Sequence, residues 1–191
     1  MLGSNFIGFQ TYSHARHFIS SCTRVIGCES SPSDVDFHGF KVAIGIIPIG
    51  INLNRVIDYL DSTSVQEKVK HIRQLFYGKK VIVGRDTMDH VKGLQHKLNA
   101  FEKFLEMYPE WHNKVALVQV SSTAKEHSNL LTKVSDTIAR INGIYGSLTS
   151  VPVHHYHHRL DPEEYYALMS IADAALITPL RDGIVFDLCL L

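Results

Sequence analysis

The 191-residue sequence has few cysteines and no long run of apolar residues. Its cysteines, Cys22, Cys28 and Cys189, are three in number and contain no C-x-x-C pair, so neither a disulfide framework nor a thiolate zinc site is indicated. The longest nearly apolar run, residues 42–51, is interrupted by two glycines and a proline and is too short to span a bilayer. A reducing compartment is therefore expected, with the cytoplasm as the default location and no membrane partner.

The sequence also lacks an excess of charge of either sign. Lys and Arg together number 19, as do Asp and Glu, so no general field attracts a polyanion, and nucleic acid is not an expected partner. The first residues contain no basic stretch followed by an apolar one, which excludes a typical secretory signal. Hydrophobic residues make up 45% and charged residues 20%, a composition that favours a compact domain and a small-molecule ligand.

Short β-branched runs alternate with stretches of helical periodicity from about residue 40 onward. The pattern predicts strands over residues 40–49, 80–83, 115–120, 151–156 and 174–177, and helices over residues 14–25, 56–60, 65–76, 94–108, 128–141 and 162–169. Such alternation requires crossover connections, which predict a doubly wound α/β fold with a mostly parallel sheet covered on both faces. Ligands of such a sheet bind beyond the carboxyl ends of the strands.

A charged loop, residues 84–93, follows one of these predicted strands. In it, Lys92 lies beside Gly93 at the start of a predicted helix, where an ammonium and free backbone N–H groups can hold a phosphate or diphosphate. No Walker A or G-x-G-x-x-G motif accompanies it. The alternative interpretation is a solvated loop with local pairing between Asp and Arg.

A second polar segment, residues 178–183, follows the last predicted strand and contains Asp182 and Gly183. A carboxylate at this position can accept hydrogen bonds from sugar hydroxyls or cap a following helix. An Asp-Gly pair is equally typical of an ordinary turn.

Four histidines lie within residues 154–158. Strand alternation places His154 and His158 on one face with Tyr156, and His155 and His157 on the other, so each face offers two imidazoles. Two ligands do not make a zinc or copper site, and the sequence predicts no tightly bound metal here.

Several motifs, taken together, resemble the trehalose-6-phosphate synthases in order and spacing. They are GFQTYSHARHF (residues 8–18), PIGIN (48–52), VGRDTMDHVKGLQHKLNAFEKFLEMYPEW (83–111), KVALVQV (114–120), RINGIYGS (140–147) and TPLRDG (178–183). The resemblance extends over residues 2–183. It implies one Rossmann-like half of a two-domain GT-B glycosyltransferase, a retaining enzyme that needs no metal or other cofactor. Such enzymes transfer glucose from UDP-glucose, the donor substrate, to glucose 6-phosphate.

The resemblance implies roles for particular residues in the donor site. In the family, an Arg and a Lys of the loop matching residues 84–93 hold the donor diphosphate. The Lys is present as Lys92, which is thereby implied in catalysis and donor binding, whereas Thr87 occupies the position of the Arg. Arg85 lies two residues before that position. Loss of one charge-assisted contact weakens donor binding by roughly 10- to 100-fold.

The remaining implied residues lie later in the chain. The resemblance implies that Asp182 acts in catalysis and contacts the donor glucose, that Gly183 belongs to the donor-binding site, and that Leu160 lies at the edge of the uracil pocket. Lys125 occupies the position of an Arg that holds the acceptor phosphate, so the charge is kept but the bidentate fork is lost.

The resemblance also implies a division of the chain. Residues 1–38 match the end of the acceptor-side domain and a connector, and residues 39–191 match an incomplete donor-binding domain. On this interpretation the chain is truncated and is expected to be inactive alone. The alternative is a non-catalytic regulatory or scaffold member of a trehalose-synthesis complex, with a protein partner.

Overall fold

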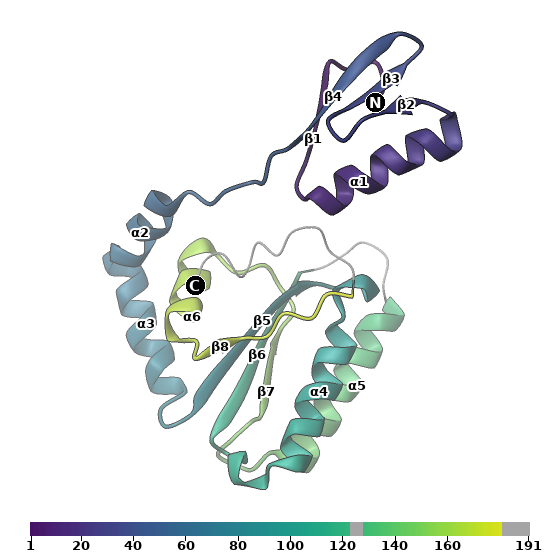
Figure 1. The fold of residues 1–191 in the computed structure, drawn as a ribbon. Helices are drawn as coiled ribbons and strands as arrows, with labels where there is room; N and C mark the ends of the chain where they lie inside the picture. Colours follow the sequence, from purple (N-terminus) through teal and green to yellow (C-terminus); the bar gives the residue numbers. More distant parts are fainter. Residues whose placement is uncertain (123–127, 181–191) are drawn as a thin grey trace. The chain divides into compact units, whose positions relative to one another are not determined.

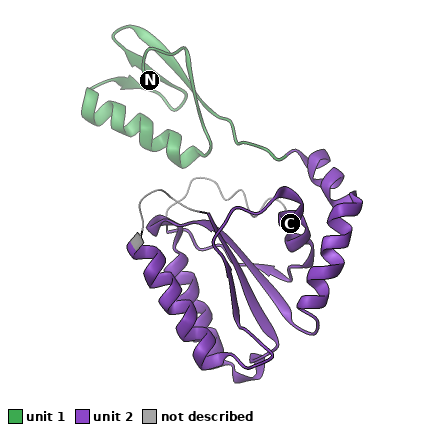
Figure 2. Cartoon of the chain, turned by 180° about the vertical axis from the view of Figure 1, so that it is seen from behind, with its two compact units in different colours: residues 1–51 green, residues 52–191 purple. Residues whose placement is uncertain are grey.

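The chain divides into two compact units, Met1–Ile51 and Asn52–Leu191 (Figure 2). The computed structural model describes residues 1–122 and 128–180. The boundary between the units lies beyond the one expected between residues 38 and 39. The reason is that the strand Phe40–Ile46 pairs with strands of the first unit.

The first unit contains one helix, a π-helical turn and a mixed sheet. Its elements are β1 (Phe6–Phe9), α1 (Tyr12–Ser21), the π-helical turn Cys22–Ile26, β2 (Glu29–Ser30), β3 (Asp34–Phe37) and β4 (Phe40–Ile46). The strand order is β1-β4-β3-β2, with β1 and β4 parallel and the other pairs antiparallel. The sequence predicted a strand at β4 but placed it in the parallel sheet, and that placement is wrong. The tight turn His38-Gly39, in which both residues have positive φ, joins β3 to β4 as a two-residue hairpin.

The second unit contains the predicted parallel sheet. Its elements are α2 (Leu53–Asp61), α3 (Thr63–Leu75), β5 (Lys80–Thr87), the 3₁₀ turn His90–Lys92, α4 (Leu94–Met107), the 3₁₀ turn Pro109–Trp111, β6 (Val115–Ser122), α5 (Ser128–Tyr145), β7 (Val153–Tyr156), α6 (Pro162–Ile171) and β8 (Ala174–Ala175). The order β7-β6-β5-β8, with every pair parallel, confirms the doubly wound α/β fold.

Helices cover both faces of this sheet (Figure 1). On one face, α4 and α5 bury apolar side chains such as Leu98 and Val134 against the sheet. On the other face, α2, α3 and α6 enclose a second cluster that includes Val65 and Ala167. The central strand β6 is therefore buried through Ser121, as a continuous apolar run in a parallel sheet requires.

Three predicted boundaries differ from the structure. Helix α3 begins before the predicted residue 65, because its N-cap is Ser62, whose hydroxyl accepts from the Val65 N–H; Ser64 instead donates to Glu163 of α6 at 2.6 Å. Strand β5 does not end at Gly84 but continues to Thr87. Helix α5 continues through the expected stop at residues 142–143 to Tyr145.

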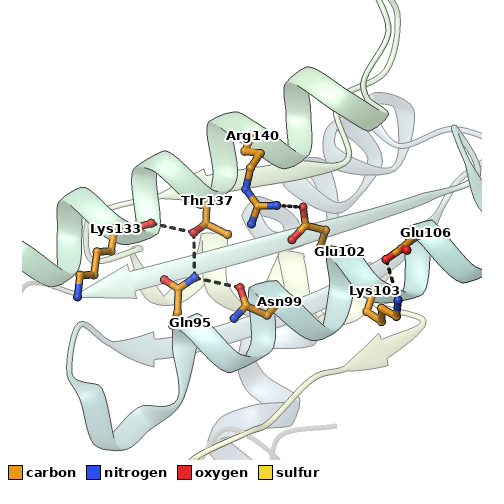
Figure 3. Close-up of polar contacts among 8 residues, drawn as sticks. All are labelled: Gln95, Asn99, Glu102, Lys103, Glu106, Lys133, Thr137 and Arg140. Carbon is orange, nitrogen blue, oxygen red and sulfur yellow. Dashed lines mark hydrogen bonds and ion pairs between the residues drawn. The ribbon is translucent and has the colours of Figure 1, made fainter.

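Polar side chains join α4 to α5 on the outer side of the sheet (Figure 3). The Gln95 amide donates to the Thr137 hydroxyl at 2.8 Å and to Asn99 at 3.1 Å. Nearby, Arg140 forms an ion pair with Glu102. These contacts fix α4 against α5 and leave its inner face to the sheet.

None of the helices in the described residues is both long enough and apolar enough to cross a membrane.

Candidate functional site

The carboxyl ends of β5 and β8 bring two of the expected segments together. After β5, the chain makes the 3₁₀ turn His90–Lys92, which starts from the Asp89 side chain and ends at Gly93. Lys92, half-buried, is the last residue of this turn, directly before α4. The prediction that Lys92 lies at the start of the helix, at the carboxyl edge of the sheet, is confirmed.

Gly93 is the point of contact with the segment that follows β8. Its φ of 70° lies in the left-handed region, and a Cβ built there would lie 2.1 Å from the carbonyl oxygen of Thr178. Close by, the N–H of Leu180 donates to the carbonyl of Val91 at 2.8 Å. The Lys92 turn and residues 178–180 therefore pack backbone to backbone, as expected of loops at one edge of a parallel sheet.

Several expected site residues lie outside the described part of the chain. Asp182 and Gly183 follow residues 178–180 after one intervening residue, Arg181, and Lys125 belongs to the segment between β6 and α5. Their expected roles stay predictions.

The end of β5 directs alternate side chains to opposite faces of the sheet. Arg85 and Thr87 are exposed, whereas Asp86 between them is buried. The guanidinium of Arg85 lies 4.5 Å from the centre of the Tyr165 ring in α6, a distance typical of a cation–π contact. Thr87 ends the strand and carries no charge, so the only cation that β5 presents near its exposed carboxyl end is Arg85.

A buried polar cluster, which the sequence patterns did not predict, lies beneath this edge. The Lys97 ammonium lies 2.5 Å from Oδ2 of Asp86, and the Gln119 side-chain amide donates to the same oxygen at 2.9 Å. Lys97 and Gln119 have no exposed surface, and Asp86 is 9% exposed. Gly84 leaves room for the cluster, because a Cβ there would lie 2.2 Å from Oε1 of Gln119.

A signal for this cluster exists in the sequence. Lys97 lies three residues after Leu94 and four before Phe101, which places it on the apolar face of α4. A charge on a buried helix face requires a partner, and Asp86 is the carboxylate that alternation in β5 turns toward α4.

The contacts of the histidine cluster agree with the predicted alternation. His155 lies with Nε2 3.1 Å from the Ser121 hydroxyl and packs near His157, whereas His154 packs edge-on against Phe76 on the other face. Burial lowers the pKa of His155, and His157 lowers it further. Burial, followed by the charge of Lys79, likewise lowers the pKa of His154. Among the described residues, no group of three or more His, Cys, Asp or Glu side chains is placed to hold a metal ion.

Leu160 borders a mostly apolar cavity of about 180 Å³ beside β7. The walls come from Phe76 after α3, Val118 of β6, Tyr156 of β7 and Leu168 of α6. The cavity has the apolar lining that a flat heterocycle requires, but its function as part of a base pocket stays a prediction.

Known proteins match most of this chain in sequence. The sequence profile of glycosyltransferase family 20 matches residues 1–186. The UDP-forming alpha,alpha-trehalose-phosphate synthase A of Dictyostelium discoideum is 42% identical over 181 residues, which make up 93% of this chain and 25% of that protein.

Two solved structures show the same fold. The N-terminal domain of Candida albicans trehalose-6-phosphate phosphatase matches with a TM-score of 0.94 and 47% identity, over 98% of this chain and 41% of that one. A UDP-forming alpha,alpha-trehalose-phosphate synthase from Burkholderia xenovorans matches with a TM-score of 0.89 and 25% identity, over 100% of this chain and 44% of that one. The chain thus spans between a quarter and less than half of the length of these relatives.

Proposed function

The chain belongs to glycosyltransferase family 20, and we propose that it forms the donor-binding part of a trehalose-6-phosphate synthase. Such an enzyme transfers glucose from UDP-glucose to glucose 6-phosphate. In this proposal the second unit binds the nucleotide sugar and the first belongs to the acceptor side. The observation that carries the proposal is the packing of the Lys92 turn against residues 178–180 through Gly93.

Lys92 has the chemistry that the departing group requires. When the bond between the glucose C1 and the diphosphate oxygen breaks, negative charge develops on UDP while the acceptor hydroxyl bonds to C1 and loses its proton. An ammonium fixed near that diphosphate stabilises the charge as it forms. Asp182 and Gly183 lie two and three residues after Leu180 in the sequence, so we assign them the hydroxyls of the donor glucose.

A titration of UDP into the chain, followed by NMR, tests the donor site. Because Thr87 stands where the family has an Arg, one charge-assisted contact to the diphosphate is missing. We therefore expect a dissociation constant for UDP near or above about 1 mM, which corresponds to a binding free energy of roughly 4 kcal/mol. Lys92→Ala should abolish the titration. Lys114→Ala, which removes an exposed ammonium at the opposite edge, before β6, is the matched control and should leave it unchanged. Equal effects of the two variants would contradict the assignment of the diphosphate to Lys92.

A second candidate function is non-catalytic. At the position where the family has an Arg in the donor loop, this chain has Thr87 and therefore no guanidinium. In addition, the solved structure that is 47% identical to this chain is the N-terminal domain of a trehalose-6-phosphate phosphatase. A regulatory or scaffold member of a trehalose-synthesis complex would bind a sugar nucleotide or a protein partner without transferring glucose. Release of UDP from UDP-glucose in the presence of glucose 6-phosphate, measured with the chain joined to a complete acceptor-binding domain, separates the two functions, since only the synthase produces it.

A further inference from the structure

We propose that Asp86, Lys97 and Gln119, here named the buried clamp, position the Lys92 turn for a diphosphate. The three are positioning residues that act through Lys92 and do not touch the ligand. The identity of the ligand rests on the proposed function. The clamp itself rests on the geometry of β5, β6 and α4.

The clamp is a closely spaced, buried cluster. Oδ2 of Asp86 accepts from the Lys97 ammonium at 2.5 Å and from Nε2 of Gln119 at 2.9 Å. Nε2 of Gln119 also donates to the carbonyl of Val120 at 3.1 Å. One carboxylate oxygen thus joins the helix α4 to both central strands of the sheet.

The clamp closes the two ends of the segment that carries Lys92. Asp86 is the residue before Thr87, where β5 ends, and Lys97 lies in the first turn of α4. The backbone N–H of Lys97 donates to the carbonyl of Gly93 at 3.0 Å, so Lys97 also holds the residue next to Lys92. With both ends fixed, residues 88–93 have little freedom to move Lys92.

Stability alone is a poor explanation for the clamp. A buried ion pair gains little over well-packed apolar residues of similar volume, because its charges must be removed from water. Gln119 is also incompletely satisfied, since its Oε1 accepts no hydrogen bond from any residue within the described ranges. The outer contacts of α4 with α5 already attach the helix (Figure 3), so the added effect of the clamp is to fix the position of its first turn against β5.

Hydrogen exchange of the full 191-residue chain tests the positioning role without any ligand. The probes are the N–H groups of Met88, Lys92 and Gly93, which are hydrogen-bonded in the structure. We expect the exchange rates of these three N–H groups to be about ten times higher in Lys97→Met than in Val134→Ala. Val134→Ala is the matched control, because it opens the same face of the sheet at a fully buried position of α5, away from the clamp. If Lys97→Met does not fold, Gln119→Met takes its place. This substitution keeps the ion pair between Lys97 and Asp86, so we expect it to raise the exchange rates of the three probes above those of Val134→Ala, but by less than tenfold.

UDP and uridine then separate positioning from general weakening. Lys97→Met should raise the dissociation constant of UDP about tenfold and leave that of uridine unchanged, because uridine has no diphosphate for Lys92. If Lys97→Met raises the exchange rates of the three probes no more than Val134→Ala does, the positioning role is overturned. Faster exchange with unchanged UDP affinity would overturn the link to Lys92. If the unmodified chain fails to bind UDP, the proposed function fails, and the exchange result still decides whether the clamp holds the turn.

Discussion

Replacement of Gly93 by alanine tests the contact that brings the two donor segments together. Gly93 has a φ of 70°, and the added Cβ would lie 2.1 Å from the Thr178 carbonyl oxygen. This oxygen belongs to the backbone, so it moves only if residues 178–180 move. The substitution therefore separates the Lys92 turn from that segment, and it also places alanine in a left-handed conformation.

The two effects can be separated by magnitude. A left-handed alanine costs about 1–2 kcal/mol, offset in part by about 0.4–1 kcal/mol from the smaller entropy of the unfolded chain. Displacement of residues 178–180 also breaks the hydrogen bond from Leu180 to Val91, worth about 0.5–1.5 kcal/mol, and loses the packing around it. We expect a total loss of about 2–3 kcal/mol for Gly93→Ala. Gly78→Ala, at a φ of 75° with open space around it, should lose only about 1 kcal/mol.

Urea unfolding measures both variants through the fluorescence of Trp111, the single tryptophan, which lies in the second unit. Gly93→Ala should also weaken UDP binding, whereas Gly78→Ala, in the turn before β5, should leave it unchanged. Equal losses of stability for the two variants, with UDP binding intact in both, would show that the Gly93 contact does not organise the site.

Two further predictions concern the donor loop and the histidines. Thr87→Arg should strengthen UDP binding by about 10- to 100-fold in calorimetry, since one charge-assisted contact of about 1.5–3 kcal/mol is restored; an unchanged affinity would mean that residue 87 does not face the diphosphate. The folded-state pKa values of His154 and His155 lie below the unfolded value of about 6.5, so the unfolded chain binds protons first as the pH falls. The free energy of unfolding should therefore decrease below about pH 6.5, by at most about 1.4 kcal/mol per pH unit for each histidine, and His155→Gln should flatten the dependence measured by urea titration.

The sequence predicts the strands of the second unit well, because their β-branched runs are buried on both faces. The sequence does not predict where a strand ends or which strands it pairs with when these depend on contacts with distant residues. Gly84 is not a stop signal, because it pairs opposite Gln119 inside the sheet and leaves room for that side chain. The strand at β4 was predicted, but its partners β1 and β3 depend on contacts that a local pattern does not contain.

Part of the candidate site could likewise be predicted from the sequence, and part could not. Topology alone predicts that Lys92 and residues 178–180 share one edge, since carboxyl ends of parallel strands meet there. The buried clamp was missed because Asp86, which lies in β5, was assigned to a charged loop over residues 84–93, and such a loop is also typical of a solvated connector. The alternation of Arg85, Asp86 and Thr87 would have separated the inward carboxylate from its exposed neighbours, had β5 been predicted to its full length.

The pairing of β8 has a consequence for the order in which the molecule folds. β5 and β6 are joined by one crossover, whereas α4, β6, α5, β7 and α6 all lie in sequence between β5 and its other partner, β8. Contacts between residues so distant in sequence require a large loss of chain entropy before they contribute, so they form slowly and late. Residues 178–180 follow β8 after two intervening residues, so their contact with Gly93 is expected among the last steps of folding. Formation of the contact between Gly93 and residues 178–180 should therefore lag behind the signal of Trp111, which belongs to the early β5–α4–β6 crossover.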